Sequence, residues 1–258
     1  MNSIDYSLLL APFAAGLLVL ATHVPLGREV LKRGIIFIDL AIAQVAGLGV
    51  MVAQMLEWGH SEGVLDWPTQ LTAALAACAG AVLLTWSGKR WPEIQEALIG
   101  LLFVFAAAAG ILLLAHNPHG GEHLKDMLAG QILWVTWAQL ALPAAVYAVV
   151  LVLWYALGRR FGDGGFYLLF ALTVTFSVQL VGVFLVFTSL IAPAIASRHR
   201  NGARGLALAY GIGALGYGLG LAASAWQDLS SGAAIACVLC LLATAGLVGS
   251  GGTGRKAH

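Results

Sequence analysis

Long apolar segments recur along the whole chain and dominate its sequence. They lie near residues 7–24, 34–56, 69–86, 96–115, 132–157, 166–197, 203–223 and 231–249. A helix needs about 20 apolar residues to cross the ~30 Å hydrocarbon core of a bilayer. The segments are long and do not alternate apolar with polar residues, so helices are favoured over the strands of a membrane barrel. The sequence therefore predicts an all-α, polytopic membrane protein with about eight transmembrane helices.

The scarcity of charged residues supports the same conclusion. Asp, Glu, Lys and Arg make up 10% of the 258 residues, whereas soluble domains carry roughly 25%. Most of the surface must therefore face lipid. The formal net charge of +1 offers no basic field for nucleic acid. No polar stretch is long enough for a soluble domain, so we expect one transmembrane domain over residues 1–249 and a flexible tail over 250–258.

The basic residues predict the orientation of the chain, because cytoplasmic loops are enriched in Lys and Arg. Three clusters place the amino terminus outside: Arg28, Lys32 and Arg33; Lys89 and Arg90; Arg159 and Arg160. Arg198, Arg200 and Arg204 conflict with this orientation if 166–197 crosses once. A broken helix with a re-entrant half, in a segment that contains Pro193, would return them to the cytoplasm. Both alternatives remain open at this stage.

Histidines and acids gather in the segments predicted to lie outside. The densest group is His116, His119, Glu122 and His123, and His60 lies in the neighbouring outer segment. Imidazole and carboxylate groups are ligands of zinc, and imidazole also suits iron and copper. We interpret the group as a site of transient metal capture. The alternative is a solvated loop with incidental histidines.

Four short stretches, spread over nearly the whole chain, carry motifs in a fixed order. They are Phe37-Ile-Asp-Leu-Ala-Ile-Ala-Gln-Val-Ala-Gly-Leu-Gly49, Leu128-Ala-Gly-Gln-Ile-Leu-Trp-Val135, Leu172-Thr-Val-Thr-Phe-Ser-Val-Gln-Leu-Val-Gly182 with Ile191-Ala-Pro-Ala-Ile-Ala-Ser-Arg198, and Asp228-Leu-Ser-Ser-Gly-Ala-Ala234. Together they resemble the permease subunits of zinc/manganese-type ABC importers. The resemblance implies a homodimer of permeases, a cytoplasmic ATP-binding subunit and an extracytoplasmic metal-binding protein. It also implies the cell membrane of a prokaryote, which is the inner membrane in a Gram-negative cell.

The chain departs from this family at the metal ligands. The family has an aspartate and, four residues later, a histidine in its second helix, and the aligned positions here are Leu40 and Gln44. Asp39 is one residue early and lies about 140° around the helix from Gln44. It either occupies another wall of the ion path or pairs with Lys32 or Arg33 near the cytoplasmic end. We assign the ion path to Asp39, Gln44 and Gln179.

The sequence also bears on the coupling to ATP. The cytoplasmic segment that the family carries between its fifth and sixth helices is reduced here to Gly158–Gly165, so Arg198, Arg200 and Arg204 are the remaining candidates for ATPase docking. The glycine-rich end, Gly249–Lys256, lacks the strand and helix of a phosphate-binding loop. We therefore expect a transport subunit that is not itself an enzyme and has no permanently bound cofactor.

The predicted function is ATP-driven import of a divalent transition metal, with zinc ahead of manganese and iron. Two alternatives stay open. One is an ABC permease for a different substrate, because Leu40 and Gln44 remove the family's ligands. The other is a self-sufficient secondary metal carrier. Such a carrier needs buried ionisable residues for coupling, and Asp39 is the sole acid in the interior of a predicted helix, since Glu96 is the first residue of its segment.

Overall fold

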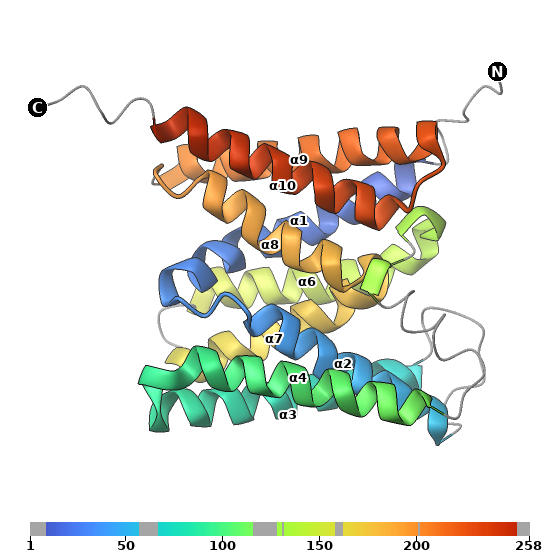
Figure 1. Cartoon of the computed structure of the whole chain (residues 1–258), viewed down its shortest axis with the longest axis vertical. Helices are drawn as coiled ribbons and strands as arrows, with labels where there is room; N and C mark the ends of the chain where they lie inside the picture. The colour runs from blue at the N-terminus through green and yellow to red at the C-terminus, as the bar shows by residue number, and fades with distance from the viewer. Residues whose placement is uncertain are drawn as a thin grey trace, which may run out of the picture.

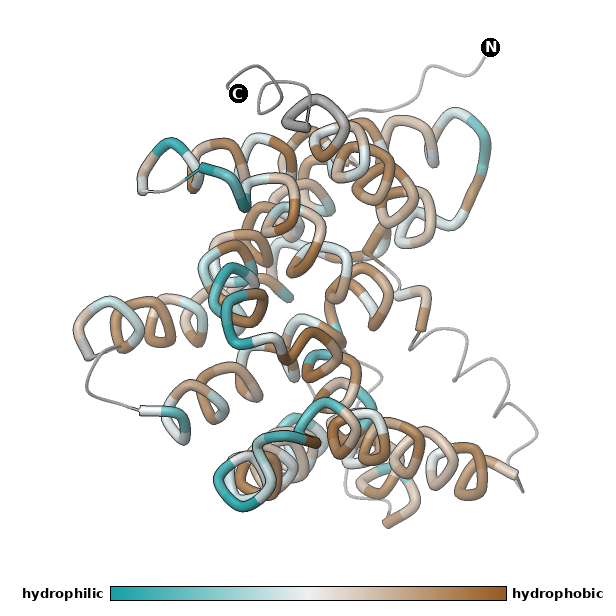
Figure 2. Tube along the Cα trace, turned by 60° about the vertical axis from the view of Figure 1, so that its left-hand side comes forward, coloured by the Kyte–Doolittle hydropathy of each residue, from teal (hydrophilic) through white to brown (hydrophobic). Residues whose placement is uncertain are grey.

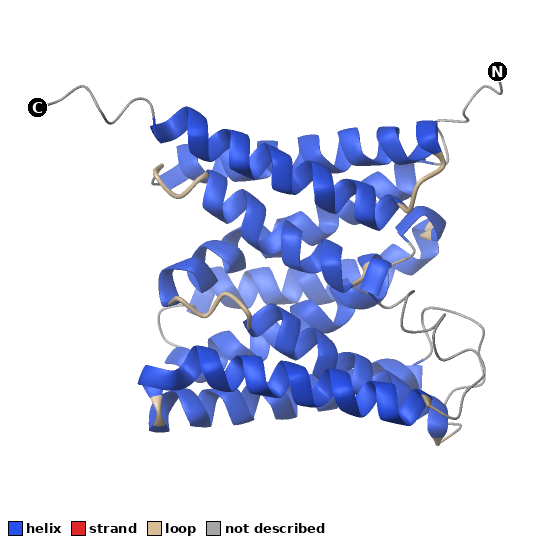
Figure 3. Cartoon of the chain, viewed as in Figure 1, coloured by secondary structure: helices blue, strands red, loops and turns tan. Residues whose placement is uncertain are grey.

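Helices form the architecture of the protein (Figures 1 and 3). The computed structural model describes residues 9–56, 67–115, 128–130, 132–157, 162–200 and 202–251, with side chains up to 247. Within these residues there are nine α-helices and no strand. The helices are α1 (Leu10–Arg33), α2 (Ile38–Met55), α3 (Trp67–Arg90), α4 (Gln95–Leu114), α6 (Trp137–Leu157), α7 (Gly162–Val181), α8 (Val183–Ala196), α9 (Gly202–Gln227) and α10 (Ser231–Gly251). Two short 3-10 helices, η2 (Pro92–Ile94) and η3 (Ile132–Trp134), precede α4 and α6.

The helices have the length and composition of membrane spans. Seven are long and apolar enough to cross a bilayer, whereas α8 and the apolar part of α10, Ser231–Leu247, are shorter. Hydrophilic segments gather at the turns and helix ends, and the helices between them are mostly hydrophobic (Figure 2). The prediction of an all-α, polytopic membrane protein is confirmed.

All lysines and arginines in the described part of the chain gather at one end of the bundle, which we call the basic end. Arg33 at the end of α1 donates to the Asp163 carboxylate in the first turn of α7 at 2.6 Å. Arg28 donates to the Arg200 carbonyl at 2.9 Å, which brings the turn before α9 to the same place. Lys89, in the last turn of α3, shares a pocket with Arg33.

The segment 166–197 is broken into two helices that form a hairpin, as the alternative of a broken helix predicted. The chain turns at Gly182, whose φ of 83° and ψ of 162° suit glycine. Pro193 lies inside α8. Since α7 leaves the basic end and α8 returns to it (Figure 1), the turn after α8 also lies there, and its Arg200 carbonyl accepts from Arg28. The conflict in the predicted orientation is thereby resolved, because the segment contributes two helices to the bundle instead of one.

The first helix also differs from its predicted extent. It continues past Pro25 to Arg33, where Gly34 caps it with a φ of 70°. Glu29 supports this last part through ion pairs with Lys32 and Arg33. His23 therefore lies in mid-helix and is fully buried.

Small residues bring the helices into close contact. Helix α9 packs on α10, α1 packs on α8 and α9, and α3 packs on α2 and α7. A methyl group on Gly216 would lie 2.2 Å from a Leu239 carbon, and one on Gly220 would lie 2.4 Å from the Ile235 Cα. The glycine pair of α9 thus serves packing within one subunit.

Candidate functional site

The start of α2 is the centre of the candidate site. The connection from α1 turns inward, so that α2 begins deeper in the bundle than the neighbouring ends of α3 and α4 (Figures 1 and 3). Ile35 of this connection is buried. The Phe37 N–H donates to Glu96 Oε1 at 3.2 Å, and the Phe37 ring stacks on Phe187 of α8 at 6.5 Å between centroids. These contacts fix the first turn of α2 between α4 and α8.

Asp39 is fully buried at this recessed helix start. Its relative exposure is 0%, and neither carboxylate oxygen has a hydrogen-bond partner among the described residues. The predicted alternative in which Asp39 pairs with Lys32 or Arg33 is wrong, because Lys32 pairs with Glu29, and Arg33 pairs with Glu29 and Asp163. A carboxylate in a membrane helix without a partner is costly. The position therefore favours a cation or a hydrogen-bond donor that arrives from elsewhere.

Leu40 and Gln44 lie on another face of α2. Phe37, Leu40, Gln44 and Leu48 follow one another at spacings of three and four residues, which places them along one side of the helix. Phe37 is 49% exposed, Leu40 and Leu48 are partly exposed, and Gln44 is 5% exposed. This α2 face borders α8 through the contact of Phe37 with Phe187. The positions that carry metal ligands in the resembled family thus lie on an apolar face with one amide.

Gln179 lies far from Asp39 along the bundle. It is near the end of α7 opposite the basic end, and its Oε1 accepts a hydrogen bond from Gln70 of α3. Its Nε2 is buried with no partner in the described part of the chain. The three predicted ion-path residues are therefore distributed over the depth of the bundle and are not brought together.

The predicted capture residues His60, His116, His119, Glu122 and His123 lie outside the described residues. Within the described ranges, no group of three or more His, Cys, Asp or Glu side chains is arranged to hold a metal ion.

The predicted docking residues lie at the basic end. Arg198 Nε donates to His199 Nε2 at 2.9 Å, and the Arg200 carbonyl is held by Arg28. Arg204 lies in the exposed first turn of α9. A methyl group on the neighbouring Gly205 would lie 2.0 Å from the Arg200 carbonyl oxygen, so the turn and the helix start are tightly packed.

Glu96 was not predicted as a site residue from the sequence. It follows the W-P-E-I turn into α4, and an acid in a first helical turn usually reads as a capping residue. Its contact with Phe37 joins residues 59 positions apart, and no local pattern could have indicated it.

Three of the four motif stretches meet at one point. A Cβ on Gly182 would lie 2.4 Å from the Gly130 nitrogen, and a Cβ on Gly232 would lie 1.9 Å from the Ala129 carbonyl oxygen. The motif glycines thus allow three backbone segments to touch at the end of the bundle opposite the basic end.

Comparison with known proteins matches the sequence to a transport family. The model of the ABC 3 transport family matches residues 5–249. The chain belongs to this family. An uncharacterized membrane protein of Synechocystis sp. is 27% identical over 260 residues, covering 91% of this chain and 88% of the relative. The permease subunits of the family lack an ATPase domain, so the prediction of a transport subunit that is not an enzyme is confirmed.

Two solved structures share the fold. PsaBC from Streptococcus pneumoniae in complex with Fab superposes with a TM-score of 0.74 at 20% identity, covering 94% of this chain and 91% of that chain. A transporter described as of the metal-chelate type, in an inward-facing conformation, gives 0.66 at 16% identity, covering 95% and 88%. These similarities support the arrangement of the helices in an ABC 3 permease.

Proposed function

We propose that the chain is the permease subunit of an ABC importer for a divalent transition metal, with zinc ahead of manganese and iron. A second copy would complete the path, cytoplasmic ATP-binding subunits would drive alternating access, and an extracytoplasmic metal-binding protein would deliver the ion. The family match over residues 5–249 supports the transport class. The metal assignment rests on the resemblance of the four motif stretches to zinc/manganese permeases.

The orientation follows from the basic end. All described lysines and arginines lie there, and such residues favour the cytoplasmic side. The exit of the path then lies near Arg33, Lys89 and Arg200, and the junction of Gly130, Gly182 and Gly232 lies near the outer side.

The main support for the proposed ion path is the burial of Asp39, which lies one residue before Leu40. A carboxylate that is 0% exposed and lacks partners among the described residues has no structural role as a hydrogen-bond acceptor. One residue corresponds to about 100° of helix rotation. Rewinding the first turn of α2 by one residue would bring Asp39 to the side of Leu40 and Gln44, where it could bind the passing ion.

Metal uptake tests this proposal in cells that express the permease with its ATP-binding subunit and delivery protein. Asp39→Asn keeps the side-chain size and removes the charge, and we expect it to abolish zinc or manganese uptake at normal expression. Asp228→Asn, the same change at an exposed residue near the opposite end, serves as the control and should leave uptake unchanged. Full uptake by Asp39→Asn would show that the Asp39 carboxylate does not take part in the ion path.

The capture site is tested in the same assay. Changing His116, His119 and His123 together to Ala should raise the metal concentration needed for half-maximal uptake while the maximal rate stays the same. A fall in the maximal rate alone would contradict a capture role.

A permease for another substrate is the second candidate. The apolar α2 face with Leu40 and Gln44 favours it, because neither side chain is a strong metal ligand. Assembly of the complete complex without accumulation of any metal would support this second candidate.

A further inference from the structure

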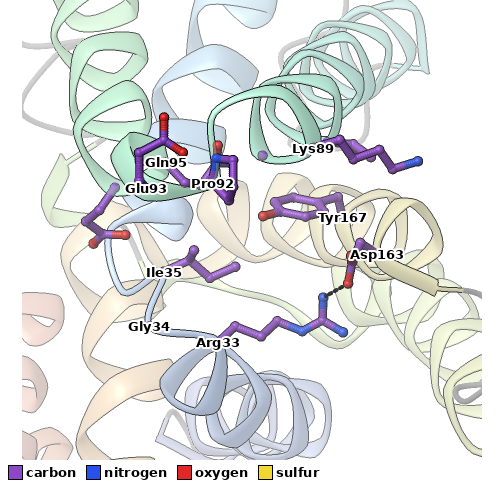
Figure 4. Close-up of a pocket in the computed structure, with 12 residues that line it drawn as sticks. Arg33, Gly34, Ile35, Lys89, Pro92, Glu93, Gln95, Asp163 and Tyr167 are labelled. Atoms are coloured by element: carbon purple, nitrogen blue, oxygen red, sulfur yellow. Dashed lines mark hydrogen bonds and ion pairs between the residues drawn. The ribbon is translucent and has the colours of Figure 1, made fainter.

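A pocket of about 430 Å³ opens between four elements at the basic end. Its lining comes from the α1–α2 connection, the end of α3, the turn into α4 and the first turns of α7. Its charged side chains are Arg33, Lys89, Glu93, Glu96 and Asp163, and all of these except Glu96 are labelled in Figure 4. Asp163 belongs to the shortened segment 158–165, so the pocket lies at the place where the resembled family carries its longer cytoplasmic segment.

The floor of the pocket is held in place. Gln95 is buried, accepts from Ser87 Oγ at 3.1 Å and donates to the Leu84 carbonyl at 2.9 Å. These bonds tie the start of α4 to the end of α3. The backbone of the neighbouring Glu96 is therefore held in a fixed position.

The positive charges of the pocket are directed elsewhere. The Arg33 guanidinium donates to Glu29 and Asp163 and lies 4.3 Å over the Phe166 ring. In Figure 4 the Lys89 side chain extends away from Glu93 and Gln95. Glu93 is exposed, and Glu96 Oε2 has no hydrogen-bond partner among the described residues. Glu93 is solvated, so Glu96 is the pocket carboxylate that would gain a missing partner by binding a cationic group.

Glu96 also holds the start of α2. Its Oε1 accepts the Phe37 N–H at 3.2 Å, and Phe37 stacks on Phe187 beside the α2 face that carries Leu40 and Gln44. Since Oε2 is covered in this state, the carboxylate can meet a cation in the pocket only by turning. Turning breaks the bond to Phe37 and frees the first turn of α2.

We propose that this pocket receives a lysine or arginine side chain of the ATP-binding subunit, and that Glu96 exchanges Phe37 for this cation. The inference rests on the proposed function only for the existence of that subunit, not for the metal. A cationic side chain is inferred because the carboxylate of Glu96 is negatively charged. The ATP-binding subunit is inferred as its source because the pocket lies at the basic end, which faces the cytoplasm in the proposed orientation. Glu96 is then a positioning residue that links ATPase docking to the Phe37–Phe187 contact.

The first test measures binding of the purified ATP-binding subunit to the full-length permease in nanodiscs, without metal. Glu96→Gln keeps an oxygen acceptor for Phe37 but removes the charge, and we expect about tenfold weaker binding, as for the loss of one charged hydrogen bond. Glu93→Gln is the matched control, since it makes the same change at an exposed position in the same pocket. It should bind within about twofold of the unchanged protein.

The second test follows the Phe37–Phe187 contact. In a background with Cys78, Cys237 and Cys240 changed to Ala, Phe37→Cys and Phe187→Cys are joined by a short bifunctional thiol reagent. Addition of the ATP-binding subunit should lower the cross-linking yield severalfold, and Glu96→Gln should abolish this response.

Three outcomes would overturn the inference. The first is equal binding by Glu96→Gln and the unchanged protein, and the second is an equal loss of binding in Glu96→Gln and Glu93→Gln. The third is a cross-linking yield that does not change when the ATP-binding subunit is added. Neither readout depends on the transported substrate, so a failure of the metal assignment would leave both results interpretable.

Discussion

Gly130 and Gly182 touch backbone to backbone. A methyl group on Gly130 would lie 2.1 Å from the Val181 carbonyl oxygen, and one on Gly182 would lie 2.4 Å from the Gly130 nitrogen. The contact closes the α7–α8 hairpin against the segment before η3, and Gly232 at the start of α10 joins it from a third side. The hairpin turn is therefore fixed by packing as well as by its own dihedral angles.

Gly182→Ala should destabilise the protein strongly. The φ of 83° and ψ of 162° form a conformation that is essentially restricted to glycine and costs other residues about 1–3 kcal/mol. The clash with Gly130 adds about 1–3 kcal/mol. Reversible unfolding in detergent micelles should show a free energy of unfolding lower by about 2–6 kcal/mol.

The control for this substitution is Gly211→Ala in α9. No atom lies within 4 Å of a Cβ at Gly211, and alanine is the better helix former by about 1 kcal/mol. This variant should be as stable as the unchanged protein or slightly more stable. Equal stability of the two variants would show that the glycine junction tolerates side chains.

The position of the turn in the α7–α8 hairpin could not be predicted from the sequence. Hydropathy located every apolar segment, but 166–197 contains no charged residue that would mark the turn at Gly182. Its length and the arginines after it indicated that one straight helix was wrong. The position of the turn depends on contacts with Gly130 and Gly232, which are distant in the sequence.

The candidate site was predicted in part. The 100° step between neighbouring helical residues separated Asp39 from the positions of Leu40 and Gln44, and α2 forms over these residues as expected. The burial of Asp39 was not predictable, because it depends on the inward path of residues 34–37 between α4 and α8. Pairing with Arg33 looked plausible from sequence distance, yet Asp163 holds Arg33 from 130 positions away.

Tyr217→Phe should destabilise the bundle moderately. The Tyr217 hydroxyl lies 2.8 Å from Ser189 Oγ, and both residues are 0% exposed. Phenylalanine leaves the Ser189 hydroxyl without this partner, which costs about 1 kcal/mol in a membrane protein core. Reversible unfolding measures the change. Tyr210→Phe, whose hydroxyl donates to the Ala21 carbonyl from a half-buried position, is the comparison and should cost less.

The ion pair between Arg33 and Asp163 should contribute little by itself. Asp163 is 65% exposed in its side chain, and exposed pairs contribute about 0.2–1 kcal/mol. A double-mutant cycle with Arg33→Gln and Asp163→Asn should give a coupling in this range, which falls as salt is raised. The single change Arg33→Gln should cost more than Asp163→Asn, because it also removes the contacts with Glu29 and Phe166.

Changing Leu40 to Asp and Gln44 to His together should strengthen metal binding. The two positions are four residues apart on one face of α2, so a carboxylate and an imidazole would point to the same side. Both groups are zinc ligands, and each 1.4 kcal/mol gained corresponds to a tenfold lower dissociation constant. Calorimetry on the purified permease should show zinc binding at least about tenfold tighter than in the unchanged protein.

The single changes Leu40→Asp and Gln44→His separate a true pair from isolated ligands, since each supplies only one group and should bind zinc more weakly than the double variant. The same double variant should import zinc more slowly at saturating concentrations, because an ion held more tightly in the path leaves it more slowly. If the double variant binds zinc no better than the unchanged protein, the α2 face does not line the ion path. The assignment of Asp39 would then have to be judged from its own substitution.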